Sequence, residues 1–146
     1  MVSSIYEWSI NHIKTVFEAK TEESCVLAID ETFSHGIEAT VNGKPLSRME
    51  LQRFVLSMVK LSGFRLNVQW QNAVEVPRDS SNRDGALGGY YVIRNVKKQG
   101  PGVPTSSRFE RHKFVNVVIE SESRDERVDS RRIVQLSLTA MDKPVI

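Results

Sequence analysis

The longest strand-like pattern in the chain is residues 64–76, FRLNVQWQNAVEV. Apolar and polar residues alternate through it, and a period of two is typical of a strand that buries one face. The apolar parity comprises Phe64, Leu66, Val68, Trp70, Val74 and Val76. Three further strand-like runs follow, whereas mostly helical patterns precede it. The sequence therefore predicts an α+β fold, in which helices of the first half pack on a sheet made largely by the second half.

Three helices are predicted from their start signals and from apolar residues at three- and four-residue steps. Ser4 with Glu7, and Ser47 with Glu50, have the spacing of a capping box. Thr21 precedes two glutamates, which suit the positive end of a helix dipole. We expect the helices to cover about residues 4–19, 21–36 and 47–63.

One short strand and three more long strands complete the prediction. The short strand covers residues 36–41 and ends at Asn42-Gly43, a strong turn signal. The long strands are expected at residues 86–98, 108–122 and 132–141. Gly88-Gly89 predicts a bulge or sharp bend, which would curl the sheet and give it a hollow side.

Length and composition set the broad class. A chain of 146 residues can bury a sizeable core, so we predict a single domain over residues 1–146. Cys25 is the only cysteine, and its place in an apolar helical pattern favours a packed thiol over a reactive one. No stretch approaches the roughly 20 apolar residues of a membrane span, and no leader pattern precedes the first helix. We therefore predict a soluble, cytoplasmic protein without membrane contact.

The element order resembles the nuclear transport factor 2-like superfamily, including its SnoaL-like and ketosteroid-isomerase-like branches. The residues that carry the resemblance are FSHGIEATVNGKPLSRMEL, residues 33–51, and the closing hairpin pattern VIESESRDERVDSRRIVQLSL. The resemblance covers nearly the whole chain and implies one SnoaL-like domain with a cone-shaped, cystatin-like α+β barrel. It also implies a pocket for a small apolar or amphipathic ligand between helices and sheet, and a homodimer built through the sheet. It implies no single activity, because members include isomerases, dehydratases, cyclases, transport adaptors and non-catalytic modules.

Acid-base catalysis is the enzymatic alternative. In the isomerase branch of the family that this chain resembles, a carboxylate base lies just after the first strand. The matching residues 41–44, VNGK, contain no carboxylate. A dehydratase-like site would pair an imidazole with an acid, and His112 with Glu120 or Asp30 are the candidates for a lyase or isomerase. The strand parity of His112 fits a cavity wall and a solvent-facing stripe alike.

The candidate pocket-lining residues lie on the predicted strands. Adjacent tyrosines on a strand face opposite ways, so one can line a cavity while the other meets the outer face or a partner. The candidates are Trp70, Tyr90, Tyr91, Phe114 and Asn116. The three histidines lack spaced acids or a second cysteine, and no P-loop or dinucleotide fingerprint occurs. We therefore predict no metal and no cofactor.

A third hypothesis is anion or nucleic-acid binding. Residues 1–40 hold seven acids and two bases, a balance of −5, which leaves +7 for the rest of a chain whose net charge is +2. Basic residues near Phe109 could hold phosphates; they are Arg94, Lys97, Lys98, Arg108, Arg111 and Lys113. Glu110 interrupts this run and no recognised nucleic-acid motif is present. The three hypotheses therefore rank as a non-catalytic ligand-binding or dimerisation module, a cofactor-free lyase or isomerase, and an anion binder.

Overall fold

The computed structural model describes residues 2–104 and 106–146, and its elements follow the predicted order, with a further short strand at Lys44–Leu46 that was not predicted. They are α1 (Ile5–Phe17), α2 (Glu22–Thr32), β1 (Phe33–Val41), β2 (Lys44–Leu46), α3 (Arg48–Leu61), β3 (Asn67–Pro77), β4 (Gly85–Val96), β5 (Phe109–Ser121) and β6 (Arg131–Pro144). None of these helices is long and apolar enough to cross a membrane.

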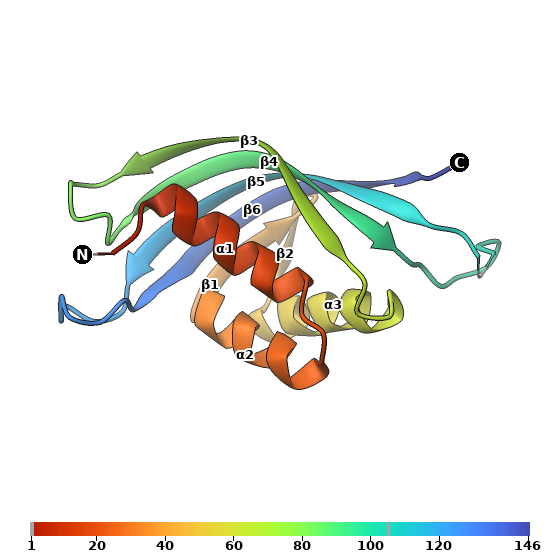
Figure 1. Cartoon of the computed structure of the whole chain (residues 1–146), viewed down its shortest axis with the longest axis horizontal. Helices are drawn as coiled ribbons and strands as arrows, with labels where there is room; N and C mark the ends of the chain where they lie inside the picture. Colours follow the sequence, from red (N-terminus) through yellow and green to blue (C-terminus); the bar gives the residue numbers. More distant parts are fainter. Residues whose placement is uncertain (1, 105) are drawn as a thin grey trace.

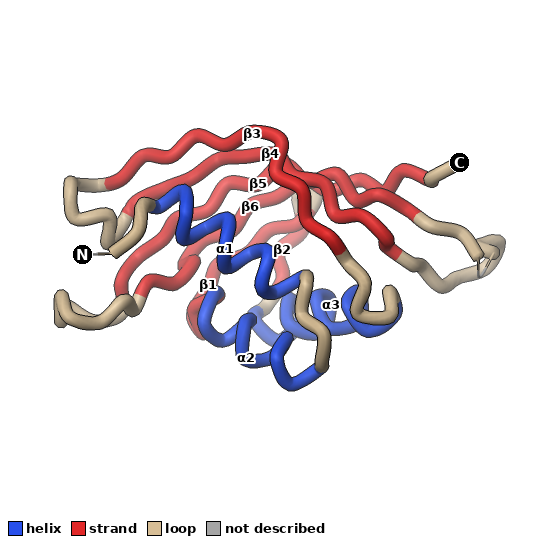
Figure 2. Tube along the Cα trace, viewed as in Figure 1, coloured by secondary structure: helices blue, strands red, loops and turns tan. Residues whose placement is uncertain are grey.

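The strands form one sheet in the order β2-β1-β6-β5-β4-β3. Every neighbouring pair is antiparallel except β1 and β6, which are parallel. All three helices lie on one side of the sheet, which bends over them (Figure 1). Figure 2 shows the same two layers, with the helices below the long strands. We call the helix-covered side the inner face and the other side the open face. The predicted α+β class, with three helices on a mostly antiparallel sheet, is confirmed.

The helix starts are formed by the predicted caps. The Ser4 hydroxyl accepts a hydrogen bond from the Glu7 backbone N–H, and Ser47 and Glu50 form a complete capping box. Helix α2 ends at Thr32, earlier than predicted, and β1 begins at once with Phe33. Phe33 is buried and pairs with Ile133 of β6, so contact with the sheet replaces the last predicted helical turn.

The predicted single core face of residues 64–76 is wrong beyond Trp70. The register between β3 and β4 shifts between Trp70 and Asn72, so Gln71 is an extra residue on β3. Such a bulge turns the following side chains to the opposite face. Val68 is therefore buried on the inner face, whereas Val74 and Val76 lie on the open face with 67% and 63% of their surface exposed.

The bulge predicted at Gly88-Gly89 is absent, because residues 85–93 of β4 pair with β5 without interruption. The pairing of β4 with β5 shifts register between Ile93 and Val96 instead. The pairing of β5 with β6 shifts register between Val118 and Ile119. Gly89 has a different role: a Cβ there would lie 2.8 Å from Trp70 Cζ3. Glycine at this position lets the indole pack directly on the backbone of the neighbouring strand.

A buried arginine ties the start of the chain to β6. Arg131 is 1% exposed, and its guanidinium donates to Asp129 Oδ2 at 2.7 Å, to the Ser3 carbonyl at 2.7 Å and to the Asn82 carbonyl at 3.0 Å. The same guanidinium lies 5.6 Å from the Trp8 ring centroid. These contacts satisfy a charge that would otherwise be costly to bury, so Arg131 has a structural role.

Candidate functional site

A narrow apolar cleft lies between the helices and the inner face. Its volume is about 30 Å³, which holds about two water molecules. Its lining comprises Ile13, Phe17, Phe33, Val41, Leu51, Phe54, Val55, Tyr91, Lys113, Val115, Ile133, Leu136, Leu138 and Ala140. The single charged group among them is the ammonium of Lys113. We call this feature the inner cleft.

Lys113 is buried in that apolar lining, with 3% of its surface exposed. Its Nζ lies 4.3 Å from the ring centroid of Phe17 and 5.7 Å from that of Tyr91. Among the described residues, no carboxylate or carbonyl accepts a hydrogen bond from this ammonium. The pKa of Lys113 falls to about 7, mainly because burial disfavours the charged amine and also because Arg111 repels it; the attraction of Asp142 offsets only part of this shift. Burial also raises the pKa of the Tyr91 hydroxyl above its usual value.

Asp142, the acid whose charge acts on Lys113, is paired with two other cations. Arg111 donates to both carboxylate oxygens of Asp142, at 2.7 and 3.0 Å, and Lys98 Nζ lies 3.2 Å from Asp142 Oδ2. Although burial acts to raise the pKa of Asp142, the hydrogen bonds from Arg111 and Lys98 hold it below its usual value. The Arg111 guanidinium also lies 5.4 Å from the ring centroid of Phe54, at the edge of the inner cleft.

The structure does not bring the three predicted catalytic residues together. His112 lies on the open face and shares a hydrogen bond with Tyr90, and partial burial together with Lys143 and Arg94 lowers its pKa. Glu120 lies at the other end of the same strand, about 26 Å away at 3.3 Å per residue.

The two acids have cationic partners of their own. Glu120 Oε2 lies 3.4 Å from an Arg78 nitrogen, and Asp30 Oδ1 on α2 lies 2.9 Å from Arg48. The separation has a simple cause, because β5 is fully extended and its open face points away from α2. Neither Glu120 nor Asp30 is thus placed to exchange a proton with His112.

The predicted pocket-lining residues divide between the two faces. Tyr91 lines the inner cleft, and Trp70 packs on it with ring centroids 4.6 Å apart. Tyr90, Phe114 and Asn116 lie on the open face, where Tyr90 pairs with Phe114 across β4 and β5. The expectation that adjacent tyrosines face opposite ways thus describes the observed arrangement.

No described helix covers the open face of the sheet (Figure 1), and large apolar side chains lie exposed on it. These side chains are Val74 (67%), Val76 (63%), Phe114 (60%) and Met141 (64%). The rings of Phe114 and Tyr90 are stacked, with centroids 4.4 Å apart. We call these five residues the open-face patch. Beside them lies a depression of about 310 Å³ over Gly88, between Val74 and Asn116.

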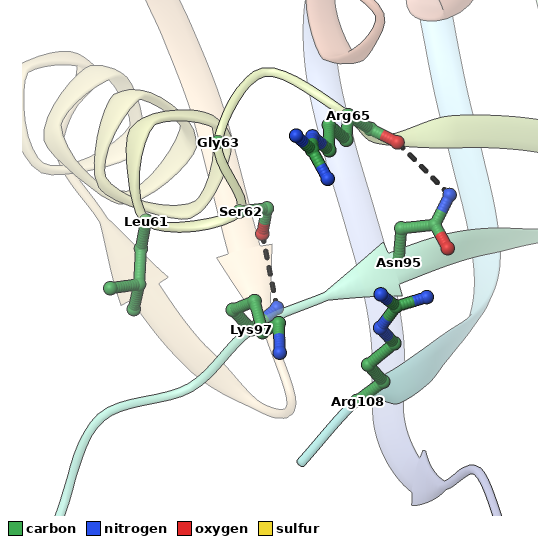
Figure 3. Close-up of a pocket in the computed structure, with 7 residues that line it drawn as sticks. All are labelled: Leu61, Ser62, Gly63, Arg65, Asn95, Lys97 and Arg108. Atoms are coloured by element: carbon green, nitrogen blue, oxygen red, sulfur yellow. Dashed lines mark hydrogen bonds between the residues drawn. The ribbon is translucent and has the colours of Figure 1, made fainter. Parts of the chain in front are cut away.

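A second hollow, of about 380 Å³, is basic (Figure 3). Arg65, Lys97 and Arg108 line it, and none of its lining residues carries a carboxylate. The Lys97 backbone N–H donates to Ser62 Oγ at 3.1 Å, and Asn95 Nδ2 donates to the Arg65 carbonyl at 3.0 Å.

The predicted basic face does not form as a whole. Only Lys97 and Arg108 of the six predicted basic residues reach the basic hollow. Arg94 pairs with Glu110, whereas Lys113 lies inside the fold. The charges disperse because β5 alternates its side chains between two faces. Among the described residues no cluster of three or more metal-ligating side chains occurs.

Sequence reasoning assigned Lys113 to the basic surface and missed its burial. The available signal was parity. Lys113 points to the same face of β5 as Val115, Val117 and Ile119, all of which are buried on the inner face. A lysine that continues a core-facing parity is an unusual element of a strand. Strand parity alone therefore indicates an interior amine at this position.

Similarity to known proteins is structural. No family model matches the chain, and no curated protein sequence matches it either. Mtr2 of Candida albicans is 12% identical over 97% of this chain and 96% of its own, with a TM-score of 0.63. A cystatin-like protein of Caulobacter vibrioides is 10% identical over 94% of this chain and 87% of its own, with a TM-score of 0.62.

Two further structures add to this picture. Rd1NTF2_04 with long sheet is 11% identical over 92% of this chain and 99% of its own, with a TM-score of 0.55. Another similar structure is the complex of Candida albicans Mtr2 with the Mex67 M domain, at 11% identity and a TM-score of 0.63. At these identities the likeness concerns the fold.

Proposed function

Because the chain has the nuclear transport factor 2-like fold, we propose that it is a non-catalytic pairing module whose open sheet face binds a second copy of the same chain. The observation that carries the proposal is the open-face patch. Its four most exposed apolar side chains belong to three different strands of one uncovered face. Apolar groups gathered on one face commonly mark an interaction site, whereas scattered ones do not.

The shape of the open face favours a second copy of the chain as its binding partner. Phe114 and Tyr90 form a raised aromatic pair, and the depression over Gly88 lies directly beside it. A two-fold axis between two copies would insert the aromatic pair of each into the depression of the other. The depression of about 310 Å³ is large enough for a ring, since a cavity of about 150 Å³ binds benzene. The Mtr2–Mex67 M domain complex supports pairing as a use of this fold.

The test replaces the raised ring by a charge. Phe114→Lys would bury an ammonium in the contact, and truncation of a central aromatic residue typically costs about 2 kcal/mol or more. We expect self-association at least about 30-fold weaker, measured by sedimentation equilibrium. Leu27→Lys is the matched control, because Leu27 is 58% exposed but lies on α2, away from the open face. Equal self-association of the two variants would refute the proposed face.

Acid-base catalysis receives less support from the site. A lyase or isomerase needs an acid within reach of His112, but Glu120 and Asp30 are paired elsewhere and distant from it. The outward position of His112 beside Phe114 instead fits a role at the proposed contact.

Anion binding is a second candidate, favoured by the basic hollow. Three cations without a lining carboxylate suit a phosphate or sulfate group, whose binding would weaken as salt rises. Arg108→Glu should abolish phosphate binding measured by calorimetry at low salt. Binding that is unchanged in this variant would remove the hollow from consideration.

A further inference from the structure

We propose that the inner cleft binds an apolar molecule that carries one carboxylate group, with Lys113 as the counter-ion of that carboxylate. This inference is independent of pairing, because the cleft lies on the inner face and the open-face patch on the other. It assigns a ligand class to a site defined by one buried cation within an apolar lining.

The argument begins with the cost of the buried ammonium. Lysine is almost never fully buried unless it is paired, since a charge loses its hydration when it leaves water. Lys113 is 3% exposed, and its described contacts are the faces of two aromatic rings. Cation–π contacts offset part of the lost hydration, but they supply no negative charge. An anionic group entering the cleft would supply it.

Among the described residues, no element packed against Lys113 provides a carboxylate that is not already paired. Helix α1 presents Phe17, and β4 presents Tyr91, whose raised pKa keeps the hydroxyl neutral. On β6 the residue paired with Lys113 is Ala140. Helix α3 contributes Leu51, Phe54 and Val55 to the lining. Arg111 and Asp142 lie nearby, but they neutralise each other through two hydrogen bonds.

The size of the cleft identifies which part of the ligand reaches Lys113. About 30 Å³ holds about two water molecules, which is the space of the two oxygens of a carboxylate. The apolar part of the ligand must then lie toward Phe54, the one large hydrophobic lining residue that is exposed, at 45%. Rotation of this side chain away from the cleft would admit a short hydrocarbon chain.

The experiment compares sodium hexanoate with 1-hexanol, which shares the chain but lacks the charge. Isothermal titration of the full chain at neutral pH should show hexanoate binding that hexanol does not match. A hydrogen bond to a charged group corresponds to about a 10- to 100-fold change in affinity, so Lys113→Met should weaken hexanoate binding by that factor. Lys113→Gln, which keeps a polar side chain, should show the same loss. Lys44→Met, at an exposed lysine of β2, is the matched control and should bind as the parent does.

Three results would overturn the inference. The first is no hexanoate binding by the parent chain, and the second is equal affinity for hexanoate and hexanol. The third is undiminished hexanoate binding by both Lys113 variants, with circular dichroism confirming that they fold. None of these results depends on whether the chain pairs through its open face.

Discussion

Replacing Lys113 by Met should change how the stability of the fold depends on pH. The pKa of this amine falls from the ordinary value of 10.5 to about 7 on folding, because burial disfavours its charge. Between these two values the unfolded chain binds a proton that the folded chain has released. The free energy of unfolding therefore rises with pH through this window. The destabilisation caused by the buried amine is greatest near pH 7 and disappears as pH rises toward 10.5.

The magnitude follows from the two pKa values. Their difference corresponds to about 5 kcal/mol over the whole window, at about 1.36 kcal/mol per pKa unit. Two other groups limit the pH range in which the slope reports Lys113 alone. Burial raises the pKa of Cys25 from 9.0 to about 11, and it also raises the pKa of Tyr91 from 10.0. Both destabilise the fold once the unfolded chain ionises. Between about pH 7.5 and pH 9, stability should thus rise by about 1 kcal/mol per pH unit.

Urea unfolding followed by tryptophan fluorescence measures this slope at fixed protein concentration. Trp8 and Trp70 report on α1 and on the sheet, respectively. Lys113→Met should be more stable than the parent at pH 7.5, and the gap should close as pH rises. Lys44→Met, at an exposed lysine, should keep the slope of the parent. Parallel pH profiles for the parent and Lys113→Met would refute the burial of an unpaired amine.

Two further substitutions test the packing. Arg131→Met should lower the free energy of unfolding by about 1–3 kcal/mol, because it removes the hydrogen bonds that tie Ser3, Asn82 and Asp129 to the buried guanidinium; Arg127→Met, whose arginine side chain is 89% exposed, should have little effect. Gly89→Ala should cost about 1–3 kcal/mol, because the new Cβ would lie 2.8 Å from Trp70 Cζ3. Gly36→Ala is its control, since a Cβ there meets nothing within 4 Å. Guanidinium denaturation measures both pairs, and equal midpoints within either pair would contradict the packing described.

Local signals in the sequence were sufficient for most element positions. Ser4, Thr21 and Ser47 cap helices as predicted, because capping depends on residues three apart along the chain. The Asn42-Gly43 turn forms as predicted, with positive φ at both residues. Such features need no knowledge of the partner strands.

Face assignments failed where they depended on pairing. One extra residue at Gln71 moved Val74 and Val76 from the predicted core to the open face. The polar pair Gln71-Asn72 interrupts the alternation there, but a polar pair alone does not reveal a bulge. The parallel pairing of β1 with β6 joins residues about 100 positions apart, which periodicity cannot reveal.

The candidate site was harder to predict than the fold. Sequence chemistry favoured His112 because imidazoles titrate near neutrality, but the strand turns it to the open face. The same strand turns Lys113 inward, where burial gives an amine a pKa near neutrality instead. One-residue alternation along β5 thus decides which of two neighbouring side chains lies inside the fold.

The molar mass in solution tests the proposed pairing most directly. Light scattering coupled to size exclusion should give twice the 16.6 kDa chain mass for the parent and for Leu27→Lys, and a lower mass for Phe114→Lys. A mass of 16.6 kDa for the parent at every protein concentration, or an unchanged doubled mass for Phe114→Lys, would contradict pairing through the open face.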